Sequence, residues 1–144
     1  MQLGPTAIRA LGGRRVLRSG ALADVRRGIA RGLRGTAVAH IERTMGLSPA
    51  ESTRVLGISP ATRKRILGAQ LRPLAANVAD RALRAARIYD ETVEHFGEKA
   101  AAGDWLRSRI HALGNERPLD LLDSDIGTQT IHDLLVQMEH GMIS

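Results

Sequence analysis

The sequence predicts an all-α fold in which a helix-turn-helix segment is followed by a small helical subdomain. Aromatic residues make up only 2% of the chain, so its core must come mainly from Leu, Ile, Val, Ala and Met, a mixture that suits helices better than sheets. Apolar residues recur at helical spacing, and Ser-Pro pairs and glycines mark where successive helices begin and end.

Composition limits the class of protein further. A chain of 144 residues fits one domain, or two small helical subdomains that share a core. The absence of cysteine excludes disulfides, thiolate metal sites and cysteine nucleophiles, and agrees with a reducing compartment. No stretch approaches the roughly 20 apolar residues that span a bilayer. We therefore expect a soluble, cytoplasmic protein.

Charge divides the chain into two regions. Residues 1–87 hold 17 of the 21 Lys and Arg residues against four acids, a net charge of +13. Residues 88–144 hold the other four bases against 11 acids, a net charge of −7. A basic region attracts a polyanion, whereas an acidic region is repelled by it and must serve another surface. Two functions in one chain are the simplest interpretation.

Residues 1–35 are rich in Arg and Gly, and we expect a basic N-terminal arm that is partly disordered. An Arg-rich, acid-poor start is also typical of transit peptides and of segments on membrane surfaces. Repeated glycines, such as Gly12-Gly13 and Gly20, interrupt any long amphipathic helix. An arm that is solvated or contacts DNA is the favoured interpretation.

Three short helices are predicted next. The first starts at Thr36 and ends at Gly46, with an apolar stripe of Val38, Ile41 and Met45. Ser48 caps the second helix, where Pro49 takes the first position, Glu51 completes a capping box and Gly57 ends the helix. Ser59-Pro60 repeats this start for a third helix that runs to Gly68.

Two short helices across a glycine-containing turn are the arrangement of a helix-turn-helix, whose second helix presents its N-terminal residues to the major groove. Arg and Lys can neutralise phosphates or pair with guanine edges, and Thr can reach either base or backbone. The alternative is an ordinary helical hairpin with a solvated basic face. The predicted DNA-binding residues are Ser59, Ala61, Thr62, Arg63, Lys64 and Arg65.

The remaining elements follow in order. Helices are predicted over about residues 77–96 and 98–108, with a loop over 111–117 that turns at Gly114-Asn115. A short helical turn starts at Pro118, and the last helix runs from about Thr128 to His140, followed by a free tail.

Catalytic and metal sites are not predicted. The five histidines have no i, i+4 pairing, and the aspartates near Asp123 lack the spacing of a calcium loop. No nucleophile elbow or phosphate-binding loop surrounds the Ser, His and Asp residues. We expect a protein that is not an enzyme and that has no cofactor and no metal.

The C-terminal region carries a specific resemblance. Its motifs occur in order from residue 96 to 141, and upstream a second group spans residues 56–65. They resemble the toxin-binding domain and the helix-turn-helix of the Xre/MbcA/ParS-like antitoxins, and they place the helix-turn-helix at 36–77 and the toxin-binding domain at 78–144. The motifs are Phe96-Gly97-Glu98, Ala100, Trp105-Leu106, Leu113-Gly114, Pro118–Leu122, Gly127, Met138–Gly141 and, upstream, Leu56–Pro60, Thr62 and Arg65.

The resemblance implies an antitoxin that forms a homodimer, binds double-stranded operator DNA at its own promoter, and blocks the active site of a RES-domain toxin that consumes NAD⁺. It also implies that the C-terminal end reaches the cleft of the toxin, where a short apolar tail can enter at little steric cost. The predicted toxin-binding residues are Glu139, His140, Gly141, Met142, Ile143 and Ser144. The predicted structural supports are Trp105, Leu106, Pro118, Leu119 and Leu122.

The chain departs from the family pattern at three places. Arg109-Ile110-His111 stands where the family often has Pro-Asn-Pro, Ala61 where it tends to have Arg, and Arg63 where it tends to have Leu. An Arg at a nominally buried site must direct its charge outward, or else the helix must be rotated.

Other classes of function stay open. A stand-alone transcription regulator would use its C-terminal region only for dimerisation. A structural protein would bind nucleic acid through the arginine-rich region without sequence preference, although few aromatics are available for stacking on single strands. Enzymatic activity is the most distant alternative.

Overall fold

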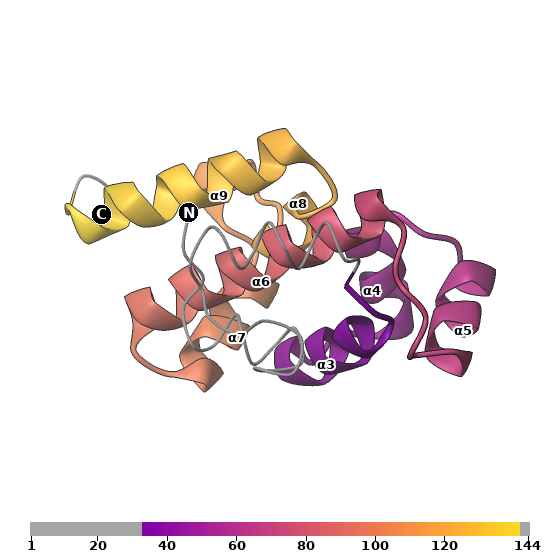
Figure 1. Cartoon of the computed structure of the whole chain (residues 1–144). Coiled ribbons are helices and arrows are strands. Elements are labelled where there is room, and N and C mark those ends of the chain that lie inside the picture. Colours follow the sequence, from indigo (N-terminus) through magenta and orange to yellow (C-terminus); the bar gives the residue numbers. More distant parts are fainter. Residues whose placement is uncertain (1–32, 142–144) are drawn as a thin grey trace.

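The computed structural model describes residues 33–141, and this part of the chain is helical apart from two isolated β-bridges (Figure 1). The predicted all-α class is therefore confirmed. The α-helices are α3 (Thr36–Met45), α4 (Pro49–Leu56), α5 (Pro60–Gly68), α6 (Ala76–Phe96), α7 (Lys99–Arg107), α8 (Pro118–Leu121) and α9 (Asp125–Glu139), and a short 3₁₀ helix, η2, covers His111–Leu113.

Helix α6 is the centre of the fold. In the view of Figure 1, α9 lies above it and α3 and α7 below it, while α5 lies at the far right end. The helix packs against α3, α4, α7 and α9. Its apolar stripe, which includes Leu83, Ile88 and Tyr89, is buried in the way that its helical spacing predicts.

A single hydrophobic core runs through both charge regions. It extends from Leu33 to Leu135 without a break, and its fully buried side chains include Ile41 from α3, Ile88 from α6 and Ile131 from α9. The basic and acidic regions of the sequence are thus parts of one packed body rather than two separate units.

The predicted helix starts are present as hydrogen-bonded caps. Glu51 N donates to Ser48 Oγ at 3.1 Å, and Ser48 N donates to Glu51 Oε1 at 2.9 Å, which completes the capping box. The stop at Gly57 favours glycine, because its φ of +64° lies in the left-handed region that other residues rarely adopt.

The start of the last helix differs from the prediction. Helix α9 begins at Asp125 rather than near Thr128, and Ser124 caps it by accepting from Gly127 N at 3.0 Å. Gly127 lies inside the first turn of α9. Glycine is required at this position because a Cβ would overlap the carbonyl oxygen of Leu121.

The folded body begins slightly before the predicted end of the N-terminal arm at residue 35. Leu33 is only 2% exposed, and Leu74 N donates to its carbonyl at 2.5 Å, so the last residues of the predicted arm belong to the folded body. Residues 1–32 of the arm and Met142, Ile143 and Ser144 lie outside the described residues.

Candidate functional sites

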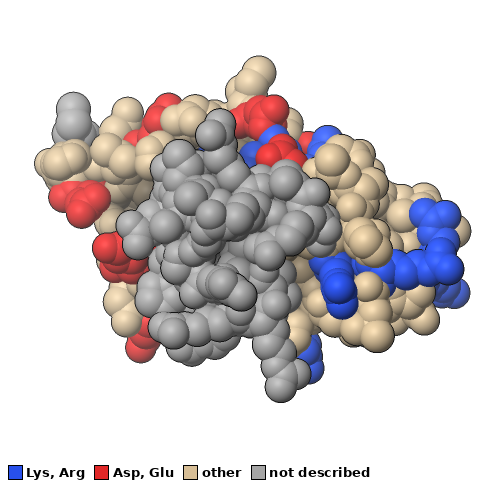
Figure 2. All heavy atoms as spheres, viewed as in Figure 1, with Lys and Arg blue, Asp and Glu red and all other residues tan. Residues whose placement is uncertain are grey.

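Helix α5 forms an exposed basic end of the molecule. It has no buried residue, and only Ile66 and Leu67 pack partly against the core. Ala61, Lys64 and Arg65 are exposed, as the predicted DNA-binding face requires. Figure 2 shows Lys and Arg gathered at this end, and Asp and Glu at the opposite end, over α9 and the last part of α6.

Ser59 and Thr62 open this helix. Thr62 N donates to Ser59 Oγ at 3.1 Å, and the two hydroxyl groups lie 3.0 Å apart. Ser59 therefore acts as the helix cap, and the backbone of the first turn is fixed before any ligand arrives. Contact of either residue with DNA stays a prediction.

Arg63 differs from its predicted outward placement. Its side chain is 19% exposed and makes two bonds to Glu42 of α3, from Nε to Oε1 at 2.6 Å and from Nη2 to Oε2 at 3.2 Å. The Glu42 carboxylate raises the pKa of the Arg63 guanidinium. The Arg63 guanidinium is thus not directed into solvent, and the helix is not rotated to expose it. The Glu42 carboxylate neutralises its charge instead.

Two further cations flank α5 that the helix-turn-helix pattern did not single out. Arg34 and Arg72 are exposed, and the backbone brings them together: Arg34 forms a β-bridge with Pro73, and Gly35 N donates to the Arg72 carbonyl at 3.0 Å. Arg65 and Arg72 both line a hollow of about 390 Å³ between α5 and the start of α6. Arg65 and Arg72 share this surface because of the way the chain folds, which the sequence pattern alone does not indicate.

The predicted structural supports lie where the C-terminal helices meet. Leu106, Pro118, Leu119 and Leu122 are buried. Trp105 is partly buried and packs on Phe96, with ring centroids 5.6 Å apart. These residues join α7 and α8 to α6.

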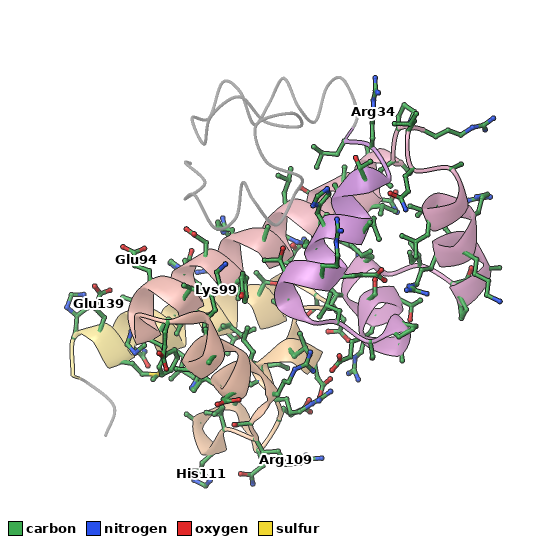
Figure 3. All side chains as sticks on the ribbon, turned by 90° about the horizontal axis from the view of Figure 1, so that it is seen from below. Arg34, Glu94, Lys99, Arg109, His111 and Glu139 are labelled. Atoms are coloured by element: carbon green, nitrogen blue, oxygen red, sulfur yellow. The ribbon has the colours of Figure 1, made fainter. Side chains whose placement is uncertain are left out.

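The end of α9 is exposed. Glu139, His140 and Gly141 are all open to solvent, and Gly141 has a φ of +68°, in the left-handed region typical of a helix end. Glu139 lies with Glu94 at the end of the molecule opposite Arg34 (Figure 3). The other three predicted toxin-binding residues, Met142, Ile143 and Ser144, lie outside the described residues.

An ion cluster joins the two regions, and we call it the α4–α8 ion cluster: Glu51, Arg54, Arg107, Arg117, Asp120 and Asp123. Arg107 Nη1 lies 2.5 Å from Glu51 Oε2, and its Nη2 donates to the Gly46 carbonyl at 2.6 Å. Arg117 bonds Asp120 through two nitrogens, each at 2.8 Å, and lies 3.6 Å from Glu51. Arg54 lies 3.4 Å from Asp123.

The cluster shifts two carboxyl pKa values. Burial raises the pKa of Glu51, but hydrogen bonds from Arg107 and Ser48 outweigh burial, and the pKa lies below its ordinary value. The hydrogen bond from Arg117 lowers the pKa of Asp120 more than its burial raises it. Both carboxylates are therefore charged at neutral pH, and they hold the two regions together.

Two family models match this arrangement in order. Residues 24–87 match the antitoxin Xre-like helix-turn-helix domain, and residues 93–141 match the antitoxin Xre/MbcA/ParS C-terminal toxin-binding domain. The chain belongs to the Xre-like antitoxin family. Helix α6 belongs to both matched regions of this family: the first match ends and the second begins within it.

Two curated relatives support the family assignment. One, named Antitoxin Xre, from Photorhabdus laumondii, is 33% identical over 70 residues, which are 48% of this chain and 47% of the relative. The other, also named Antitoxin Xre, from Yersinia enterocolitica, is 34% identical over 67 residues, or 46% and 45% of the two chains. The chain spans about half the length of the curated relatives it matches.

Neither a membrane-spanning helix nor a cluster of metal-ligating side chains is present among residues 33–141. None of the helices between residues 33 and 141 has the length and apolarity that crossing a membrane requires. Within the same residues, no three His, Asp or Glu side chains gather in a way that could hold a metal ion.

Proposed function

We propose that this chain is the antitoxin of a toxin–antitoxin pair and acts by binding rather than by catalysis. Its partner is a RES-domain toxin that consumes NAD⁺. The tail from Gly141 to Ser144 enters the active-site cleft of that toxin, and Glu139 and His140 contact the toxin beside it. The observation that carries the proposal is the exposed end of α9, within a region that matches a toxin-binding domain. Gly141 favours a change of direction there, which lets the tail leave the helix.

The same chain represses its own operon through α5. Lys64 and Arg65 are exposed at the basic end, and Arg34 and Arg72 add positive charge beside them. Such cations neutralise phosphates, while the first turn of the helix reads base edges in the major groove. We propose that it acts as a homodimer on double-stranded operator DNA, in the bacterial cytoplasm.

Co-expression with the neighbouring gene tests the antitoxin role. The full chain should restore growth to cells that produce the neighbouring protein. A chain that lacks Gly141–Ser144 should lose this protection while it keeps its affinity for promoter DNA, because α9 ends at the opposite side of the molecule from α5 (Figure 1). Failure of the full chain to protect would contradict the proposal.

The truncation also distinguishes an antitoxin from the main alternative, a stand-alone transcription regulator. A stand-alone regulator that uses its C-terminal region only to dimerise would tolerate loss of the tail. Competition with unrelated duplex at matched salt decides whether the basic end reads sequence, because binding through phosphates alone makes promoter and random DNA equal.

A further inference from the structure

A groove opens between the last part of α6 and α9, at the end of the molecule away from α5. Its volume is about 520 Å³, and its walls combine carboxylates, hydrocarbon side chains and the imidazoles of His95 and His132. Glu91 and Glu94 line it from α6, and Val136, Met138 and Glu139 from α9. No Lys or Arg is among its lining residues.

The carboxylates of the groove are not equivalent. Glu91 is already engaged, because its Oε2 lies 2.6 Å from His132 Nδ1 and its Oε1 lies 3.8 Å from Arg87 Nε. Glu94 and Glu139, in contrast, are exposed and form no ion pair with any other described residue. They face solvent from two different helices at the same end of the molecule (Figure 3). Two carboxylates are thus available to a cation.

Hydrocarbon lies beside these free charges. Val136 is 38% exposed, and Met138 is partly buried next to it. Leu135, which also lines the groove, is buried and anchors this part of α9 in the core. A ligand that carried only positive charge would leave the side chains of Val136 and Met138 exposed to water. A segment with a cation next to an apolar side chain would satisfy both parts of the groove.

We propose that this groove docks a segment of the partner toxin that presents a Lys or Arg beside an apolar side chain. The cation lies between Glu94 and Glu139, and the apolar side chain packs on Val136 and Met138. The inference rests on the proposed antitoxin function and deepens it. All the lining residues except Glu91 fall within the part matched to a toxin-binding domain.

The position of the groove explains why two contacts would serve better than one. Glu139 lines the groove and lies two residues before Gly141, where the tail begins. A toxin segment seated in the groove would hold the toxin beside the tail and raise the local concentration of the tail at the cleft. DNA is a poor occupant, because the free carboxylates repel phosphate.

The test replaces both free carboxylates by their amides, as Glu94→Gln with Glu139→Gln. The matched control is Glu98→Gln with Glu116→Gln, which changes the net charge equally at exposed residues that do not line the groove. The purified product of the neighbouring toxin gene is titrated against each full-length chain at low and high salt. We expect about tenfold weaker binding for the groove variant at low salt, and a smaller difference at high salt. The control should bind like the wild type.

A second variant probes the apolar part. Val136→Ser should weaken binding about fivefold with little dependence on salt, since it removes apolar contact rather than charge. Unchanged thermal melting of each variant alone would show that the fold is intact.

The outcomes separate the two proposals. If the wild-type chain does not bind the neighbouring protein, the antitoxin function is rejected and the groove inference with it. If the wild type binds and the groove variant binds equally well, the groove inference alone is overturned. If the substitutions instead change self-association of the free chain in sedimentation, the groove is a contact between copies and the inference is also overturned.

Discussion

The basic end around α5 and the acidic end around α9 are anchored in opposite ways. Helix α5 contributes no fully buried side chain, whereas α9 buries Ile131, Leu134 and Leu135 and is locked at Gly127 against α8. The basic end therefore has little packing to hold it, and its orientation depends on caps and on the Arg63–Glu42 pair. The acidic end is held by buried side chains of α9 as far as Leu135.

The contrast in charge is weaker in the folded chain than in the sequence. Arg54 and Arg84 belong to the basic region, yet they pair with Asp123 and Asp125 of the acidic region. Arg107 and Arg117 of the acidic region pair in turn with Glu51 of the basic region. Opposite charges at the boundary neutralise each other, so free charge is left at the two far ends, where partners would bind.

The largest expected effect tests how firmly the acidic end is locked. Gly127→Ala should destabilise the chain by about 4 kcal/mol, because the new Cβ meets the backbone carbonyl of Leu121, which cannot move away without unwinding α8. The control is Gly103→Ala in α7, where the added Cβ meets open space and should stabilise the chain by about 0.5–1 kcal/mol. Urea unfolding measures both. Equal midpoints for the two variants would contradict the packing at Gly127.

The second prediction asks whether the two ends unfold together. Ile41→Ala in α3 and Ile131→Ala in α9 each remove a side chain that is 0% exposed, and each should cost about 3 kcal/mol. Because one core contains both residues, each substitution should shift the same single transition, followed by circular dichroism and by Trp105 fluorescence.

Ile126→Ala is the matched control for this pair. Ile126 is in α9 but 82% exposed, so its loss should change stability by less than about 0.5 kcal/mol. Two separate transitions, one sensitive to each core substitution, would show that the charge boundary also divides the fold.

Local chemistry explains how much of this fold the sequence could predict. Ser48 with Glu51, Ser59 with Pro60, and the stop at Gly57 are signals within a few residues of chain, and each one marks a helix end in the structure. The start of α9 at Asp125, before the predicted Thr128, is where the local signals failed. A glycine next to polar residues usually ends a helix, and only the approach of Leu121 from α8 explains one in the first turn of α9.

The sites depended on contacts that no local pattern contains. Arg63 and Glu42 are 21 residues apart, and Glu51 and Arg107 are 56 apart, so their pairing follows from how the helices pack. The outward placement of Lys64 and Arg65 could be predicted from their spacing in α5. The groove at α6 and α9 joins residues about 40 positions apart, and the family resemblance pointed to its region but not to its walls.

The third prediction concerns the α4–α8 ion cluster and pH. The pKa values of Glu51 and Asp120 are lowered in the folded chain from ordinary values of 4.5 and 3.8. The unfolded chain therefore binds more protons as the pH falls, so their stabilisation is complete above the ordinary values and is lost as the pH drops through the lowered ones. Glu51→Gln should cost about 1–2 kcal/mol at neutral pH, and this difference should vanish in acid.

Urea unfolding at a series of pH values checks the third prediction. Glu116→Gln is the control, because Glu116 is exposed and outside the cluster, and its unfolding should follow the wild type at every pH. A Glu51→Gln variant whose stability keeps the full acid dependence of the wild type would contradict the role given to Glu51.

The smallest expected effect is on promoter affinity, and it distinguishes the exposed cations of α5 from Arg63, which is paired with Glu42. Lys64→Ala and Arg65→Ala remove exposed charges, so each should weaken promoter binding by about 1 kcal/mol and lower the slope of log affinity against log salt by about one, with stability unchanged. Arg63→Met should instead lower stability, because it leaves Glu42 partly buried without its partner, while the salt slope stays near that of the wild type. Promoter titrations at several salt concentrations, together with urea unfolding, distinguish the two results. A salt slope that falls equally in all three variants would place Arg63 on the DNA and would mean that the pair with Glu42 opens on binding.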